Sequence, residues 1–202
     1  FSLNCVIGAV YGASEGYFGC IADLIMERIS DILNDIPFIV LASIVNIKLI
    51  ETGKMSSLGA VLFAFVLTGW LGPAYLVRTQ FYRFKNQEYV LAARTLGAGN
   101  ARIMFKHIFP NTLGTIITST VLTIPSTIFS ESSLSYLGII NLNQGGITSL
   151  GTMLATGQAY MTTFPHIIVP PCIVISLLMI SFNLFGNGLR DALHPSLRGV
   201  EE

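Results

Sequence analysis

Long apolar stretches free of charge alternate with short polar segments along this chain. A helix needs about 20 apolar residues to cross the hydrocarbon core of a bilayer. We expect membrane helices at residues 1–14, 36–47, 58–77, 108–130 and 166–189, of which the second can extend to 32–50 and the first is incomplete. The pattern therefore predicts an all-α bundle with about five spans, and we expect at least one further span upstream.

The polar and small residues refine this bundle. Gly8, Gly12 and Gly16 recur every four residues on the first helix, a spacing that lets membrane helices pack closely. Asp35 precedes Pro37, and we expect it to cap the helix that follows. Residues 132–165 are uncharged but rich in Gly, Ser, Thr and Asn, so we expect a long external loop with short helices.

The composition agrees with a membrane protein. Charged residues make up 11% of the chain and hydrophobic residues 52%, with a mean hydropathy of +0.67. Soluble proteins carry about 25% charged residues, so an ordinary soluble domain is excluded, as is a disordered chain. The 11 basic residues are balanced by 11 acidic ones, which argues against nucleic acid as a partner.

Basic residues in the connecting segments set the orientation, because cytoplasmic loops carry an excess of Lys and Arg. Two lysines, Lys48 and Lys54, fall on one side of the expected bundle. Nine basic residues fall on the other side, namely Arg28, Arg78, Arg83, Lys85, Arg94, Arg102, Lys106, Arg190 and Arg198. We therefore expect that second side, with the C-terminus, to lie in the cytoplasm.

Residues 78–111 form a long basic loop whose pattern predicts ordered structure. Asn86 can cap a helix in which Glu88 lies in the first turn and Arg94 in the last, as the helix dipole favours. An apolar face recurs at i, i+3, i+4 and i+7, at Tyr89, Ala92, Ala93 and Leu96. Gly97 and Gly99 bracket a break. Asn100 can cap a second helix over residues 101–108, which Pro110 is expected to end.

A short amphipathic helix outside the membrane has two interpretations. It can lie on the lipid surface, as interfacial helices do. Its apolar face is narrow and built of alanines, which favours close packing in a groove of a cytoplasmic protein partner.

Residues 88–97 and 102–111 resemble the EAA loop of ABC-importer permeases, in the form found in the dipeptide/oligopeptide/nickel subfamily. Ala92 and Ala93, then Gly97, then Pro110 thirteen residues later match the spacing of that family. Leu91 stands where the general pattern has Glu, and the acid at Glu88 is typical of the subfamily. His107 replaces an Ile.

Other blocks extend the resemblance over nearly the whole chain, at residues 16–37, 131–138, 151–154 and 183–195. Leu150 departs from the family, which usually has Trp there. The last block is more similar to the C-type peptide permease subunit than to its B-type partner.

The resemblance implies a fold, partners and a function. The fold is a polytopic helical bundle of the type I (MetI-like) permease kind, forming one domain over residues 1–202. Residues 78–111 are the coupling loop, and residues 132–165 lie outside. The implied partners are a homologous second permease, two cytoplasmic ABC ATPases that bind ATP and Mg, an external solute-binding protein and the lipid bilayer. The chain itself is expected to be a transport subunit without enzymatic activity.

The implied cargo is oligopeptides or dipeptides, although nickel and other small-solute importers share these motifs. Rival classes are a secondary transporter acting without ATPases and an intramembrane enzyme. The first lacks a convincing inverted repeat or paired intramembrane charges, and the second lacks a catalytic constellation.

Within the resemblance, the expected coupling residues are Glu88, Tyr89, Ala92, Ala93, Arg94, Leu96, Gly97 and Pro110. Glu131 lies at the outer end of an apolar helix, where it either faces the pathway or an external partner, or anchors the helix at the interface. We expect no metal site, because His107, His166 and His194 lack ligand spacing and the three cysteines form no CxxC pair. No phosphate-cradling GxxxxGK[ST] occurs, so we expect no ATP or other cofactor bound by this chain.

Overall fold

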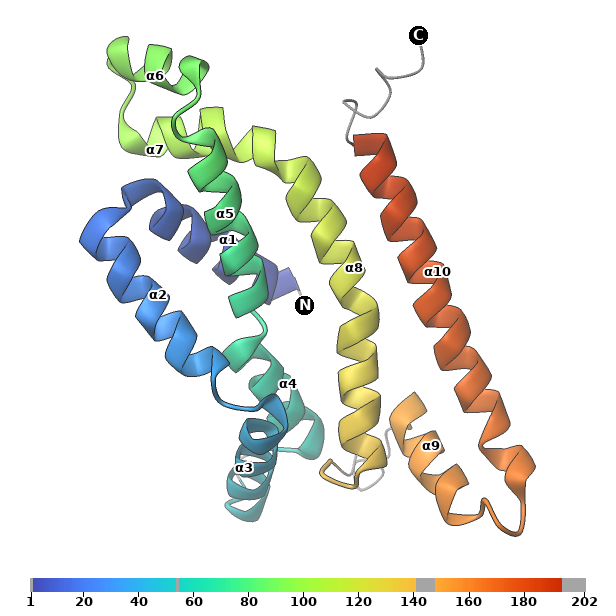
Figure 1. The fold of residues 1–202 in the computed structure, drawn as a ribbon. Helices are drawn as coiled ribbons and strands as arrows, with labels where there is room; N and C mark the ends of the chain where they lie inside the picture. The colour runs from blue at the N-terminus through green and yellow to red at the C-terminus, as the bar shows by residue number, and fades with distance from the viewer. Residues whose placement is uncertain (1, 54, 141–147, 194–202) are drawn as a thin grey trace, which may run out of the picture. The chain divides into compact units, whose positions relative to one another are not determined.

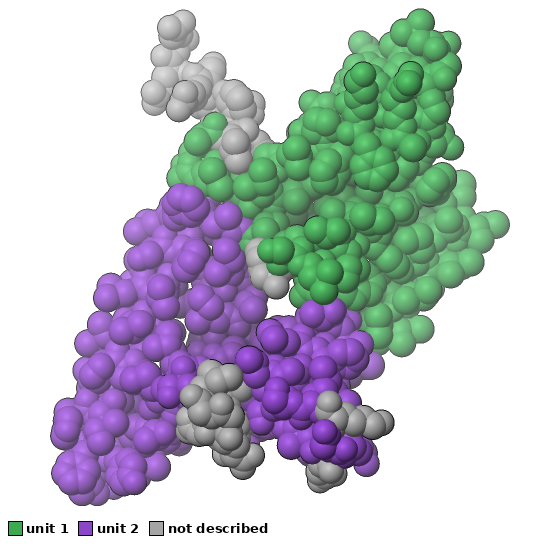
Figure 2. Space-filling model, turned by 180° about the vertical axis from the view of Figure 1, so that it is seen from behind, with its two compact units in different colours: residues 1–35, 68–120, 188–202 green, residues 36–67, 121–187 purple. Residues whose placement is uncertain are grey.

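The computed structural model describes residues 2–53, 55–140 and 148–193, and within these ranges the regular structure is helical (Figure 1). The chain forms two compact units (Figure 2). Unit 1 comprises residues 1–35, 68–120 and 188–202, and unit 2 comprises residues 36–67 and 121–187. The chain therefore passes between the units at four points.

Each unit collects helices from separate parts of the chain. Unit 1 contains α1 (Ser2–Phe18), α2 (Cys20–Asn34), α5 (Leu71–Phe84), α6 (Glu88–Thr95), α7 (Asn100–Arg102), the π-helical segment η1 (Ile103–Ile108) and the first part of α8 (Phe109–Tyr136). Unit 2 contains α3 (Phe38–Glu51), α4 (Ser57–Thr68), the rest of α8, α9 (Leu150–Ala159), the short 3₁₀ turn η3 (Pro165–Ile167) and most of α10 (Val169–Leu193).

Helices α1 and α5 pack in direct backbone contact in unit 1. A Cβ atom added at Gly12 would lie 2.1 Å from the carbonyl oxygen of Ala74. At Gly8 and Gly16 the corresponding distances, to the carbonyl oxygens of Trp70 and Arg78, are both 2.7 Å. Because no side chain fits in these gaps, the glycine repeat determines how closely the two helices approach.

The core of unit 1 joins this helix pair to the segment that follows α5. Buried side chains of α1 and α5 pack with buried side chains from residues 90–116, and the cluster consists of Ala13, Tyr17, Val77, Phe81, Val90, Ile103, Met104, Ile108 and Ile116. The segment 85–108 is thus packed onto unit 1 rather than free in solvent.

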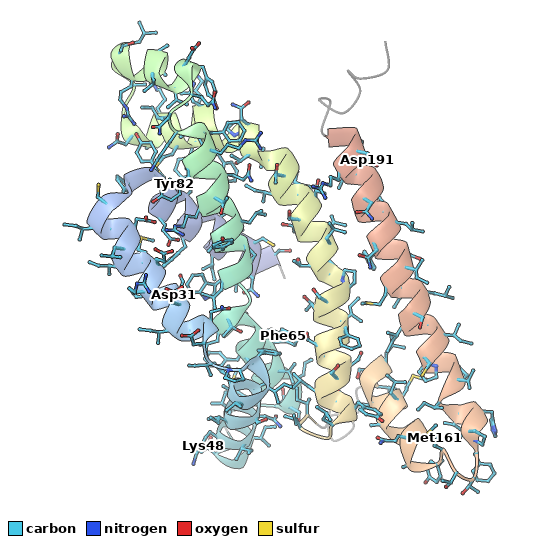
Figure 3. All side chains as sticks on the ribbon, viewed as in Figure 1. Asp31, Lys48, Phe65, Tyr82, Met161 and Asp191 are labelled. Atoms are coloured by element: carbon cyan, nitrogen blue, oxygen red, sulfur yellow. The ribbon has the colours of Figure 1, made fainter. Side chains whose placement is uncertain are left out.

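Unit 2 is held by a second cluster, consisting of Leu41, Ala42, Val61, Ala64, Leu134 and Ile140. The rings of Phe38 in α3 and Phe65 in α4, the latter labelled in Figure 3, have centroids 4.9 Å apart. The Asn46 side-chain amide of α3 donates a hydrogen bond of 2.5 Å to the carbonyl oxygen of Ile139. Together these contacts join α3 and α4 to the end of α8.

The helices explain how the chain can span a membrane. Ser57–Phe84, Asn100–Tyr136 and Pro165–Ala192 are each long and apolar enough to cross by length and composition, and α2 with α3 passes the same test as a broken pair. Helix α1 has 17 residues, which is close to the length of a span. Helix α9, with 10 residues, is too short to cross a bilayer by itself.

The expected helix over residues 32–50 is wrong as one continuous element, because α2 ends at Asn34 and α3 begins at Phe38. The expected cap is also wrong, since Asp35 is instead the C-cap residue of α2, and its N–H bonds to the Asp31 carbonyl. Pro37 precedes α3 with ψ near 124° and no side-chain cap. Proline pushes the preceding residue out of the helical region, which ends α2.

The expectation that Pro110 ends a helix is wrong as well. The chain remains helical from Asn100 to Tyr136, with Pro110 as the second residue of α8. The turn before it is π-helical, and the Phe109 N–H bonds to the Met104 carbonyl, five residues back. A proline has no N–H to pair with residue i−4, and a wider turn reduces the clash of its ring with that carbonyl.

Helix α8 also extends beyond the expected end at residue 130, so residues 132–136 are helical. Of the expected external loop, residues 141–147 lie outside the described residues, as do Lys54, His194 and Arg198.

Candidate functional site

Helix α6 is a short helix outside the candidate spans, with well-defined ends. Gln87 occupies the N-cap position in extended conformation, so the expected cap at Asn86 is wrong. Glu88 lies in the first turn and Arg94 in the last, as predicted from the dipole argument. At the C-terminus the N–H of Gly97 bonds to the Arg94 carbonyl and the N–H of Ala98 to the Ala93 carbonyl.

This pair of bonds is a Schellman motif, which requires a left-handed residue after the C-cap. Gly97 supplies it with φ of 82°, as its sequence position indicated, whereas Gly99 is extended with φ of −71°. The left-handed conformation costs a residue with a Cβ about 1–2 kcal/mol. Gly97 therefore ends α6 at a defined position.

The expected apolar stripe of α6 divides between two sides. Val90 and Ala93 are buried against the chain itself, so the structure contradicts the prediction of one face that includes Ala93. Tyr89, Ala92 and Leu96, at i, i+3 and i+7, remain exposed. Leu96 is 88% exposed and Tyr89 39%, although both side chains are large and apolar.

Segment η1 and α7 hold α6 on unit 1. Gly99 rather than Asn100 is the N-cap residue of α7, so the expected cap is wrong. The Asn100 side-chain oxygen instead accepts a hydrogen bond of 2.8 Å from the Tyr17 hydroxyl of α1. Ile103, Met104 and Ile108 of η1 are buried in the same core as Val90. The inner side of the segment is therefore fixed, and its outer apolar side is exposed.

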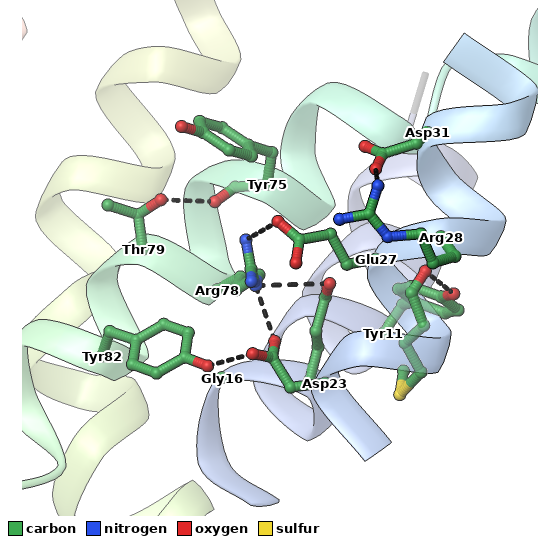
Figure 4. Close-up of polar contacts among 12 residues, drawn as sticks. Tyr11, Gly16, Asp23, Glu27, Arg28, Asp31, Tyr75, Arg78, Thr79 and Tyr82 are labelled. Carbon is green, nitrogen blue, oxygen red and sulfur yellow. Dashed lines mark hydrogen bonds and ion pairs between the residues drawn. The ribbon is translucent and has the colours of Figure 1, made fainter. Parts of the chain in front are cut away.

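A charged cluster inside unit 1 was missed by the sequence reasoning, which placed Arg78 in a loop (Figure 4). Arg78 lies on α5, and its Nε is 2.8 Å from Asp23 Oδ1 and 3.3 Å from Glu15 Oε1. Its Nη1 is 3.0 Å from Glu27 Oε1. The Tyr82 hydroxyl donates a further hydrogen bond to Asp23.

One signal for this cluster was present in the sequence. Glu15 lies within an otherwise uncharged stretch of residues 1–22, and acidic residues in apolar helices usually have a partner. The partner itself comes from a helix 63 positions further along the chain and could not be identified from spacing.

Lys85 is the C-cap residue of α5 and lies next to this cluster. Its Nζ donates a hydrogen bond of 2.9 Å to the Gly16 carbonyl and lies 3.9 Å from the centre of the Tyr82 ring. Burial lowers the pKa of the Lys85 ammonium, with the nearby Asp23 carboxylate opposing that shift. The end of α5 is thus tied to the end of α1.

Glu131 belongs to unit 2 and is half-buried on α8. Its carboxylate accepts a hydrogen bond of 2.9 Å from the Ser135 hydroxyl, one turn further along the same helix. The His166 ring lies against Phe164 in the turn η3. In the described ranges no three His, Cys, Asp or Glu side chains are grouped so as to hold a metal ion.

Comparison with known proteins shows the family of this chain. Residues 6–199 match the family described as binding-protein-dependent transport system inner membrane component. The oligopeptide transport system permease protein OppC of Bacillus subtilis (strain 168) is 41% identical over 196 residues, which are 97% of this chain and 62% of the relative. The dipeptide transport system permease protein DppC of the same organism is 40% identical over 197 residues, with 97% and 59% covered.

The fold has a counterpart among solved structures. The crystal structure of an amino acid ABC transporter with histidines superposes with a TM-score of 0.58 at 17% identity, covering 94% of this chain and 85% of that one. The chain spans about three fifths of the length of the two permeases from Bacillus subtilis. On the match over residues 6–199, this chain belongs to the family of binding-protein-dependent transport system inner membrane components.

Proposed function

We propose that this chain is a transmembrane permease subunit of an ATP-driven importer that moves oligopeptides or dipeptides into the cell. Two relatives at about 40% identity carry oligopeptide and dipeptide transport in their names, which supports this cargo. In this proposal the chain crosses the inner membrane several times, and its C-terminus lies in the cytoplasm. A homologous second permease completes the pathway, and an external solute-binding protein delivers the peptide.

The observation that carries the proposal is the outer face of α6. Tyr89, Ala92 and Leu96 are exposed on a helix whose inner side is packed into unit 1. Large apolar side chains exposed beyond the spans favour a protein contact. We assign residues 85–108, here named the coupling segment, to docking on a cytoplasmic ATPase subunit.

The docking residues then have separate roles. Tyr89, Ala92 and Leu96 contact the ATPase directly, and Glu88 and Arg94 orient the helix by polar contacts. Ala93 and Gly97 act within the chain, the first by close packing and the second by ending the helix. When two ATPase subunits close on ATP and Mg, they move the coupling segment, and the permease pair changes between its outward and inward states.

The test is peptide uptake into proteoliposomes that contain the full importer complex with the chain at its full length. We expect uptake of a labelled dipeptide or oligopeptide only with binding protein and ATP. Uptake without ATP would favour a secondary transporter. ATP-driven uptake of nickel in place of peptide would show that the cargo is nickel.

Docking itself is tested with Leu96→Asp. A carboxylate placed in an apolar contact is costly, so we expect the ATPase subunits to dissociate during purification while the permease still inserts into the membrane. Thr95→Ala is the matched control, because it changes the neighbouring exposed residue on another side of α6. Full retention of ATPases by the Leu96→Asp protein would contradict the docking assignment. Ala93→Trp is a poorer probe, because an indole at this buried position would displace α6 itself.

A further inference from the structure

Helix α2 is attached to unit 1 by its polar side. A surface helix of a soluble protein packs its apolar side against its own unit. In α2 no residue is buried, and five of its large apolar side chains, namely Ile21, Leu24, Ile25, Ile29 and Ile32, are exposed. Its acidic side chains Asp23 and Glu27 face α5 instead. Polar contacts therefore make a large contribution to holding α2 in place.

Most of these contacts converge on Arg78. The guanidinium is 15% exposed and meets two carboxylates from α2 and one from α1, at distances of 2.8 to 3.3 Å. A guanidinium, with five N–H donors in a planar fork, can serve three carboxylates at once. Besides it, Tyr82 donates to Asp23, and the Tyr11 hydroxyl donates to the Met26 carbonyl over 2.8 Å.

Helix α5, which contains Arg78, also packs against the coupling segment. Phe81, one turn further along α5, is fully buried with Val90, Ile103 and Ile108. One side of α5 thus contacts the coupling segment through an apolar core, and Arg78 contacts α2 through charges. A displacement of α5 has to be followed by α2 as long as the ion pairs persist.

Helix α2 is also the element by which the chain first leaves unit 1. It ends at Asn34, and the chain enters unit 2 at Ile36, directly before Pro37 and α3. Movement of α2 therefore acts on this non-helical connection.

We propose that Arg78 is a positioning residue that links the coupling segment to α2, so that displacement of the segment is transmitted through α2 to the connection at residues 35–37. This inference rests on the proposed function, because it assigns the route by which ATPase movement reaches the membrane helices. Arg78 acts through Asp23 and Glu27 and touches neither peptide nor nucleotide in this role.

The test loosens α2 without disturbing the α1–α5 pair. The double variant Asp23→Asn with Glu27→Gln removes both α2 carboxylates, while Glu15, which is 3% exposed, keeps Arg78 as its partner. The matched control is Asp31→Asn, which removes an acid of α2 whose ion pair with Arg28 lies at the surface. Both variants are measured in the full importer complex.

Two readouts separate positioning from a merely structural role. The first is peptide imported per ATP hydrolysed, and the second is ATPase retention during purification. We expect the double variant to keep its ATPase subunits but to import about tenfold less peptide per ATP, a change within the range of typical coupling free energies. The Asp31→Asn control should match the wild type.

A spin label at Ile29→Cys, on the exposed side of α2, reports the attachment once the free cysteines Cys5, Cys20 and Cys172 are replaced by serine. We expect faster label motion in the double variant. An unchanged ratio of peptide to ATP would overturn the inference, as would a ratio no lower than that of Asp31→Asn. Slow label motion in the double variant would overturn the attachment of α2 through Arg78. If the wild-type complex imports no peptide with ATP, the proposed function has failed, and the inference fails with it. If the wild type imports peptide normally and the double variant has the same ratio of peptide to ATP, the inference alone is overturned.

Discussion

The contact between α1 and α5 gives the sharpest quantitative prediction, and the perturbation is a single methyl group at Gly12. This residue lies where the α1 backbone approaches the α5 backbone at Ala74. We compare Gly12→Ala with Gly188→Ala, an equally small change in the interior of α10 that has no atom within 4 Å of the added Cβ.

The magnitude follows from the geometry. The added Cβ would lie 2.1 Å from the Ala74 carbonyl oxygen, whereas ordinary van der Waals contact begins at 3.4 Å. The obstacle is backbone on both sides, so the helices must separate by about 1 Å, which forfeits a quarter to a half of the dispersion energy at their contact. Overpacking of this kind costs about 1–3 kcal/mol or more, and we expect a value near the upper end. Gly188→Ala should instead stabilise α10 by about 0.5–1 kcal/mol, because alanine is the better helix former.

The assay is unfolding by titration with sodium dodecyl sulfate from mild detergent, followed by the fluorescence of Trp70. This side chain lies at the same contact, since its ring centre is 4.7 Å from that of Tyr11 on α1. We expect the Gly12→Ala protein to unfold at lower detergent content and with an altered native fluorescence. Equal midpoints for the two alanine variants would refute the backbone contact between α1 and α5.

Two further predictions concern the coupling segment. Gly97→Ala should place a Cβ in the left-handed region and lower the stability of the end of α6 by about 1 kcal/mol, seen as faster hydrogen exchange at the Ala98 amide with little change in α1. Protection unchanged at that amide would contradict the Schellman motif. Tyr17→Phe removes the hydroxyl that bonds Asn100 and should cost about 1 kcal/mol, measured as faster exchange over residues 100–102. The matched change Tyr75→Phe, at an exposed position on α5, should have no such effect.

The sequence alone could predict the helices and several of their ends. Inside a bilayer each backbone N–H and C=O has to be paired within the segment, so a long uncharged run predicts a helix without further information. Local chemistry also placed Glu88, Arg94 and Gly97 correctly at the ends of α6. The preference of charged side chains for one end of the helix dipole, and of glycine for the left-handed conformation, depends only on neighbouring residues. The wrong assignments were local too, since Asp35, Asn86 and Asn100 were expected to cap helices and Pro110 to end one, and the structure has none of these.

Only the tertiary structure decided which side of each helix is used. The periodicity of α6 placed Ala93 and Leu96 on one stripe, yet Ala93 is buried and Leu96 is the more exposed by far. A helical period specifies which residues share a face, but the surface that covers the face comes from other segments, here α5 and η1. The same reason applies to Arg78. Its carboxylate partners come from α1 and α2, more than 50 positions earlier, and their ion pairs depend on how three helices pack rather than on any local pattern.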